Sequence, residues 1–163
     1  MKKTVTILSL VLLLSACSTP YPDTRSPEVQ KNQLIKSLNE LIGNYKVLDS
    51  RNDDYAKFSS LKVTSEINQM NIMMLSQENK IFQLNGKDCI GRYKEQEKDA
   101  FIICSKPSEN VNLFTFERVL NERKITDGAV VGGFKPLTVK EGDYLLSYWT
   151  KNGRPHHYIL KRQ

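Results

Sequence analysis

The 163-residue sequence lacks two features that would point to a common class of function. Its longest nearly apolar run, Val5 to Leu14, has ten residues, whereas a membrane-spanning helix needs about 20. Lys and Arg are spread along the chain instead of forming a block, which argues against a nucleic-acid partner. The sequence therefore predicts neither a spanning helix nor a nucleic-acid-binding protein.

Catalytic and metal-binding signatures are also missing. Ser59-Ser60 is not part of a Gly-x-Ser-x-Gly elbow, and Gly132-Gly133 is not part of a phosphate-binding pattern. The only histidines, His156 and His157, are adjacent, so in a regular strand they point to opposite faces and cannot bind one metal ion together. We expect no enzyme, no cofactor and no metal site.

The N-terminus has the pattern of an export signal. Lys2 and Lys3 precede the apolar run, and the small residues Ser15 and Ala16 follow it. We expect residues 1–16 to be removed. Without Lys2 and Lys3 the chain keeps 22 basic and 18 acidic side chains, a net charge of +4, which is a mild excess.

The end of this signal, Leu14-Ser15-Ala16-Cys17, resembles the lipobox of bacterial lipoproteins. The resemblance implies that Cys17 becomes the lipidated first residue of the mature protein, and two or more acyl chains make a stable membrane anchor. Ser18, where Asp would favour retention, implies an outer-membrane lipoprotein whose domain faces the periplasm. The alternative is an ordinary cleaved signal with a chance cysteine.

The mature chain divides into a tether and one domain. Residues 17–27 contain three prolines and little to bury, which is typical of a flexible extended linker. Residues 28–163 suit a single domain in length. Ser26-Pro27-Glu28 is a helix-start pattern, and apolar residues recur at helical spacing until Gly43. We expect one N-terminal helix.

The rest of the domain consists of short β-type runs between turn signals. Glu78-Asn79, Asn85-Gly86 and Gln96-Glu97 predict three turns that join four antiparallel strands between residues 72 and 105, and Asn152-Gly153 predicts a closing hairpin. The predicted fold class is α+β, mainly β, with an antiparallel meander that forms a small barrel or a sandwich.

The two cysteines that remain after Cys17 are predicted to form a disulfide. A hairpin centred on Gln96-Glu97 pairs Tyr93 with Ala100 and places Cys89 opposite Cys104. Directly opposed residues have Cα atoms about 4.5 to 5.5 Å apart, within disulfide reach, and an exported compartment permits the bond. Two buried free thiols are the alternative.

The closing hairpin supplies a possible binding surface. Symmetric pairing about Asn152-Gly153 puts Trp149 opposite His156 and Tyr148 opposite His157, so both faces are apolar or aromatic and both are expected to be covered. The candidate surface residues are Tyr148, Trp149, His156, His157 and Tyr158.

Two segments resemble those of lipocalins. Gly43-Asn44-Tyr45 after a helix is similar to the Gly-x-Trp that opens the first lipocalin strand, and Gly142-Asp143-Tyr144 with Tyr148 is similar to the Thr-Asp-Tyr segment. The resemblance implies a barrel that carries a small apolar ligand. Our first expectation is instead non-catalytic binding of a partner protein, glycan or other envelope component, with the carrier as the alternative.

The lipid assignment predicts the outcome of removing one side chain. Cys17→Ala removes the acylated atom, so the protein should move from the membrane fraction to the soluble fraction on cell fractionation. Unchanged membrane association of the variant would contradict the assignment.

Overall fold

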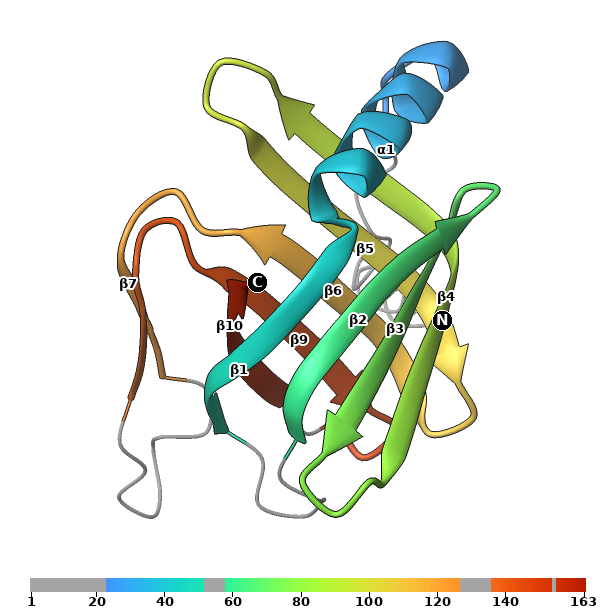
Figure 1. Cartoon of the computed structure of the whole chain (residues 1–163). Helices are drawn as coiled ribbons and strands as arrows, with labels where there is room; N and C mark the ends of the chain where they lie inside the picture. The colour runs from blue at the N-terminus through green and yellow to red at the C-terminus, as the bar shows by residue number, and fades with distance from the viewer. Residues whose placement is uncertain (1–22, 52–57, 127–135, 154) are drawn as a thin grey trace, which may run out of the picture.

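The computed structural model describes residues 23–51, 58–126, 136–153 and 155–163. The export signal, Cys17 and the first part of the tether lie outside these residues, as does Gly132-Gly133. The described residues form one helix and ten strands (Figure 1). The elements are α1 (Pro27–Leu41), β1 (Gly43–Arg51), β2 (Phe58–Glu66), β3 (Gln69–Ser76), β4 (Ile81–Lys94), β5 (Asp99–Ser108), β6 (Val111–Arg118), β7 (Arg123–Ile125), β8 (Leu137–Val139), β9 (Tyr144–Thr150) and β10 (Pro155–Arg162).

Eight of the strands close into an antiparallel barrel in the order β1-β10-β9-β6-β5-β4-β3-β2. Chain neighbours are also neighbours in the barrel, except that the small β7–β8 sheet is inserted between β6 and β9. The mainly β fold with one N-terminal helix is confirmed. Of the two predicted architectures the structure has the barrel, because β1 pairs with both β2 and β10.

Helix α1 begins as the sequence predicts. The Ser26 side chain accepts a hydrogen bond from the Val29 N–H, and Pro27 takes the first helical position. Leu34, Leu38 and Leu41 form the buried stripe of the helix at the spacing of one helical face. That stripe faces the barrel core.

The helix covers one end of the barrel, which we call the closed end (Figure 1). Its contacts are mainly with β4 and β5. The two backbones approach closely at Gly91, where an added Cβ would lie 2.5 Å from Cα of Leu34. Only glycine leaves room for the helix backbone at this point.

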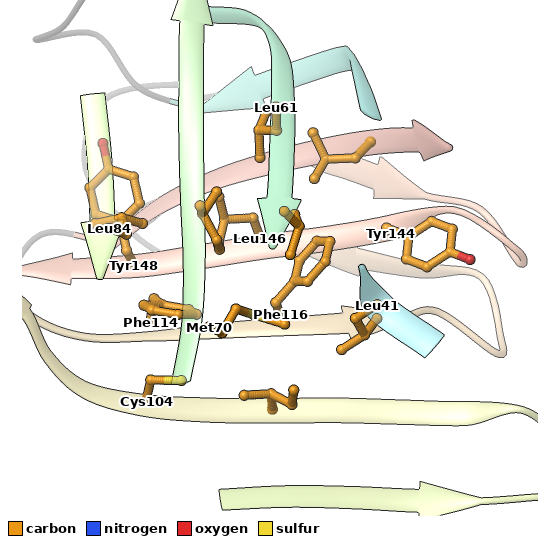
Figure 2. Close-up of a cluster of buried hydrophobic side chains, with 14 of the residues drawn as sticks. Leu41, Leu61, Met70, Leu84, Cys104, Phe114, Phe116, Tyr144, Leu146 and Tyr148 are labelled. Carbon is orange, nitrogen blue, oxygen red and sulfur yellow. The ribbon is translucent and has the colours of Figure 1, made fainter. Parts of the chain in front are cut away.

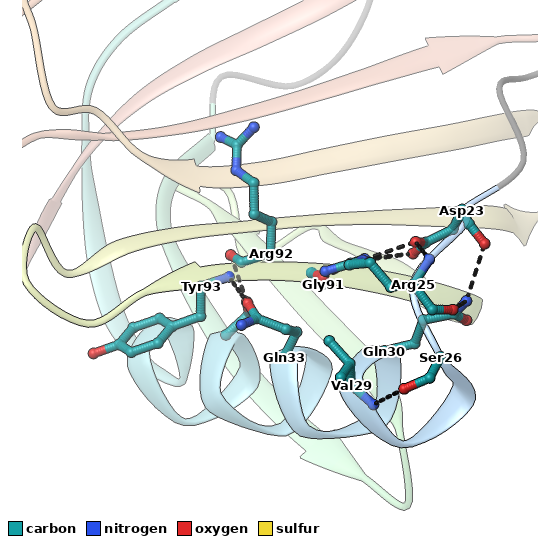
Figure 3. A network of polar contacts seen from close by, with 10 residues as sticks. Asp23, Arg25, Ser26, Val29, Gln30, Gln33, Gly91, Arg92 and Tyr93 are labelled. Atoms are coloured by element: carbon teal, nitrogen blue, oxygen red, sulfur yellow. Dashed lines mark hydrogen bonds and ion pairs between the residues drawn. The ribbon is translucent and has the colours of Figure 1, made fainter.

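Side chains near the start of α1 also bind the backbone of β4 (Figure 3). Strand β4 pairs with β3 only as far as Gly86 and continues to Lys94, so its later residues extend past that partner strand. Along this extension, Arg25 donates to the Gly91 carbonyl at 3.1 Å and Gln33 accepts from the Tyr93 N–H. The helix thus supplies partners for backbone groups that an edge strand would leave exposed.

Arg162, at the end of β10, joins the last strand to the junction of α1 and β1. Its guanidinium lies over the rings of Tyr45 and Tyr144, at 5.8 and 5.5 Å from their centroids, and donates to the Ile42 carbonyl at 2.6 Å. The Tyr45 hydroxyl donates to the Leu41 carbonyl at 2.7 Å. Burial raises the pKa of Tyr45, so this donor stays protonated.

The interior of the barrel is filled by aromatic, leucine, isoleucine and methionine side chains that alternate along the strands (Figure 2). A second, smaller cluster lies outside the barrel between the β7–β8 sheet and the β9–β10 hairpin, and comprises Val119, Ile125, Leu137, Val139, Leu145 and Ile159. The closing hairpin is therefore covered on both faces, as predicted, although its outer cover includes β7 and β8.

The turn predicted at Asn85-Gly86 is wrong. Both residues lie inside the continuous strand β4, opposite Asn71 and Met70 of β3. An added Cβ at Gly86 would lie 2.7 Å from the Cys104 side chain. The glycine is thus needed for close packing inside the barrel, and the predicted four-strand meander is three strands, β3 to β5.

The hairpin centred on Gln96-Glu97 is confirmed, with Tyr93 opposite Ala100. Cys89 and Cys104 form the predicted disulfide, with an S–S distance of 2.04 Å and a Cα–Cα distance of 4.1 Å. Their direct pairing is wrong, because Asp88 and Cys89 together oppose Cys104 in a β-bulge. Asp88 has a φ of +47°, the left-handed conformation of a bulged residue.

The β9–β10 hairpin forms, but its predicted register is wrong by one residue. Tyr148 lies opposite His156, and Trp149 opposite Pro155. The reason is the turn type: the Gly153 N–H donates to the Thr150 carbonyl at 2.9 Å, and Gly153 has a φ of +75°. Gly153, which has the left-handed conformation, therefore lies at the end of the tight turn. This is the arrangement of hairpin loops longer than two residues, whereas a two-residue turn would place Gly153 at the centre of the turn.

The contact at Gly91 predicts an unequal cost for two glycine substitutions. Gly91→Ala forces a Cβ into the helix backbone and should lower the free energy of unfolding by about 3 kcal/mol, the upper part of the usual overpacking range. Gly153→Ala meets no atom within 4 Å and should cost about 1 kcal/mol through backbone strain alone. Urea unfolding measures both, and equal costs would contradict the described packing of α1.

Candidate binding site

The end of the barrel opposite α1, which we call the open end, is bounded by strand connections. The up-and-down order places the β3–β4, β5–β6 and β9–β10 turns there, beside the end of β1 and the start of β2. The only helix among the described residues covers the closed end. Among the described residues, this end of the barrel is therefore formed by turns.

Five aromatic rings lie inside the barrel toward the open end, and we call them the ring cluster. They are linked by contacts of Tyr148 with His156 at 4.6 Å and with Phe82 at 5.7 Å between centroids, and of Phe58 with Tyr158 at 6.1 Å. Four strands, β2, β4, β9 and β10, supply these rings. Such offset aromatic contacts stabilise a rigid apolar surface.

A cavity of about 230 Å³ adjoins the ring cluster. Its apolar lining comes from Phe82, Val111 and Tyr148, and its rim is polar. A hydrogen bond of 3.0 Å from the Lys151 N–H to the Asn110 carbonyl holds the two rim turns together. The rim residues are Ser108, Glu109, Asn110 and Thr150.

The structure divides the predicted binding surface between two faces of the hairpin. Tyr148, His156 and Tyr158 belong to the ring cluster inside the barrel. Trp149 and His157 lie on the outer face, with their rings edge to face at 6.3 Å. The prediction that the two histidines point to opposite faces is confirmed.

On the outer face, Ser147 and His157 form a hydrogen bond of 2.8 Å between Oγ and Nδ1. Such a pair is the minimum for an activated serine nucleophile, but both residues are only 3% exposed. A substrate would not reach the hydroxyl without displacing the outer layer. We interpret the pair as a buried polar contact.

Metal ligands are not concentrated anywhere in the part of the chain that the structure describes. No group of three or more His, Cys, Asp and Glu side chains there is arranged to hold an ion. The described charged groups instead form surface ion pairs, such as Lys36 with Glu95 at 3.0 Å. The described lining of the cavity at the open end offers apolar contact, neutral hydrogen-bonding groups and one carboxylate, that of Glu109.

Sequence reasoning did not identify Phe58, Phe82 or the rim turn at residues 108–111. Phe82 and Leu84 alternate as inward-facing residues should, but the turn predicted at Asn85-Gly86 cut their strand short. The rim turn lies in a polar stretch, residues 107–112, that contains no distinctive motif. The sequence signal that could have identified the site is the alternation of inward-facing and outward-facing residues, continued past Gly86 as one strand.

A second hollow, of about 310 Å³, lies on the outer side of β2, β3 and β4. Five of its seven lining residues have polar side chains, and the lining comprises Lys62, Thr64, Asn71, Ile72, Met73, Gln83 and Asn85. It has one charged side chain and no aromatic ring. The cavity at the open end is the better candidate because its apolar floor and polar rim are typical of binding sites.

Comparison with known proteins supplies no relative. No protein-family model, curated protein or solved structure matches this chain. Within the described ranges, no helix has the length and apolar character needed to cross a membrane. The functional interpretation therefore depends on the chain's own sequence and geometry.

Proposed function

We propose that this chain is a lipid-anchored outer-membrane protein that binds a partner protein or envelope component at the open end of its barrel, without catalysis. The observation that carries the proposal is the cavity beside the ring cluster, which combines an apolar floor with a polar rim. The resemblance of Leu14-Ser15-Ala16-Cys17 to a lipobox supports the anchor.

The size of the cavity favours one group of a larger partner over a whole free ligand. Small-molecule pockets have volumes of about 300 to 1,000 Å³, and this cavity has about 230 Å³. That volume suits an aromatic or branched side chain, or one face of a sugar ring. Insertion of one such anchor into a pocket is a common basis of protein recognition.

The polar rim suits the orientation of such a partner. Ser108 and Thr150 carry hydroxyl groups, Asn110 an amide and Glu109 a carboxylate. Hydrogen bonds at a rim fix orientation and register, while the apolar floor supplies the binding energy.

The disulfide supports an exported location. Cys89 and Cys104 are bonded, and disulfides persist in oxidising compartments such as the bacterial periplasm. Placement of the domain on the periplasmic side of the outer membrane agrees with this chemistry and with the residues around Cys17.

A carrier of a small apolar ligand is the second candidate. The closed eight-stranded barrel, with Gly43-Asn44-Tyr45 directly after a helix, favours it. The side chains near α1 fill the barrel interior (Figure 2), so a ligand would lie toward the open end. Organic extraction of the purified protein followed by mass spectrometry would recover a stoichiometric apolar molecule if the carrier function holds.

Site-specific photocrosslinking in intact cells tests the first candidate. p-Benzoylphenylalanine in place of Asn110, on the cavity rim, should give a discrete adduct with one envelope component. The same group in place of Asn44, an exposed residue at the closed end, is the matched control and should not give that adduct. Ser108→Trp, which fills the cavity with an indole ring, should abolish the adduct at position 110.

The competing outcomes are distinct. Equal adducts from positions 110 and 44, or an adduct at 110 that survives Ser108→Trp, would contradict binding at the open end. Asn44→Trp serves as the second control, since it adds the same ring far from the cavity and should leave the adduct intact.

A further inference from the structure

We propose that the closed end of the barrel rests on the lipid bilayer, with Ile67 at the β2–β3 turn inserted among the lipids, so that the open end faces away from the membrane. This inference rests on the lipid anchor of the proposed function. It adds an orientation and a second membrane contact to that anchor.

The first observation is the conformation and exposure of Ile67. It is 95% exposed, and it forms a two-residue turn with Asn68 between the paired residues Glu66 and Gln69. Ile67 and Asn68 have φ values of +32° and +64°, a left-handed conformation that β-branched residues rarely adopt. The turn therefore presents an isoleucine to the outside at its tip, where asparagine or glycine is usual.

The second observation is the short distance between the predicted acylated residue and the barrel. Six peptide steps join Cys17 to Asp23, and six extended residues span at most about 20 Å. Asp23 is held at the closed end, because it forms an ion pair with Arg25 and Arg25 donates to the Gly91 carbonyl at 3.1 Å (Figure 3). The acyl chains must therefore lie near Gly91.

The length of the tether favours the closed end over the open end at the bilayer surface. Ten residue steps along β4 separate Gly91 from Ile81, which begins the strand at the open end. At about 3.3 Å per residue the path along the strand is roughly 33 Å, longer than the extended tether. With the acyl chains near Gly91, the closed end is the end that the tether holds at the bilayer.

The β2–β3 turn lies beside the same part of β4 that Arg25 contacts. Met70 of β3 pairs with Gly86, so the turn that precedes Met70 lies beside the residues of β4 that follow Gly86. Among these, Ile90 is 46% exposed and directly precedes Gly91, the acceptor of the Arg25 hydrogen bond. Figure 1 shows the start of α1 and the β2–β3 turn at the same end of the barrel.

The contact is apolar and does not depend on anionic lipid. The residues that flank Ile67 are Glu66 and Asn68, and neither is positively charged. Electrostatic attraction to lipid head groups weakens with salt, whereas burial of an isoleucine does not. Lipid contact at position 67 should therefore persist at high ionic strength.

The test uses the full-length acylated protein in vesicles of phosphatidylethanolamine and phosphatidylglycerol. p-Benzoylphenylalanine replaces Ile67 in one variant and Ile81 in the other. Ile81 is the matched control, because it is an isoleucine 60% exposed at the open end. After irradiation, mass spectrometry should find phospholipid adducts at position 67 and none above background at position 81, at low and at high salt.

Each other outcome overturns the inference. Three outcomes with vesicle-bound protein would refute the orientation and leave the anchor intact. They are the absence of a lipid adduct at position 67, equal adducts at both positions, and attachment of a second copy of the chain at position 67. Failure of both variants to associate with vesicles would refute the anchor itself, and the orientation with it.

Discussion

The close packing of α1 on the barrel at Gly91 is the constraint on which the rest of the structure depends. The backbone at Leu34 lies so near β4 that a Cβ at position 91 would be 2.5 Å from it. This approach lets Leu34, Leu38 and Leu41 join the barrel core and closes one end. The ring cluster and the cavity lie toward the opposite end.

Arg162 and the disulfide hold two places in the barrel near α1. Arg162 binds the backbone carbonyl of Ile42 and covers Tyr45 and Tyr144, so the last strand is joined to the start of the first. The Cys89–Cys104 bond lies at the bulge where β4 continues toward the helix. Closure removes exposed sheet edges, which would otherwise pair with other chains.

Local signals in the sequence predicted the local features of the fold. The helix start at Ser26-Pro27, the hairpin at Gln96-Glu97 and the disulfide all follow from residues close in sequence or symmetric about one turn. The strand through Asn85-Gly86 was missed because an Asn-Gly pair signals a turn, whereas Gly86 serves here to make room for Cys104 of the next strand. A local pattern does not distinguish these two uses of glycine.

The candidate site was only partly predictable for a related reason. Tyr148, His156 and Tyr158 come from one hairpin, but Phe58 and Phe82 join them through strands distant in sequence. Their meeting depends on barrel closure and on register, and the predicted register of β9 and β10 was one residue from the observed one. The structure was therefore needed to show which face of the hairpin points into the barrel.

Amide chemical shifts during titration with N-phenyl-1-naphthylamine, a small apolar aromatic probe, test most directly that the open end is the binding site. The signals of Val111, Tyr148 and Thr150, which line the cavity, should shift and saturate together, while those of Leu34 and Leu41 at the closed end stay fixed. Shifts confined to the closed end, or scattered over the outer surface without saturation, would contradict binding at the open end.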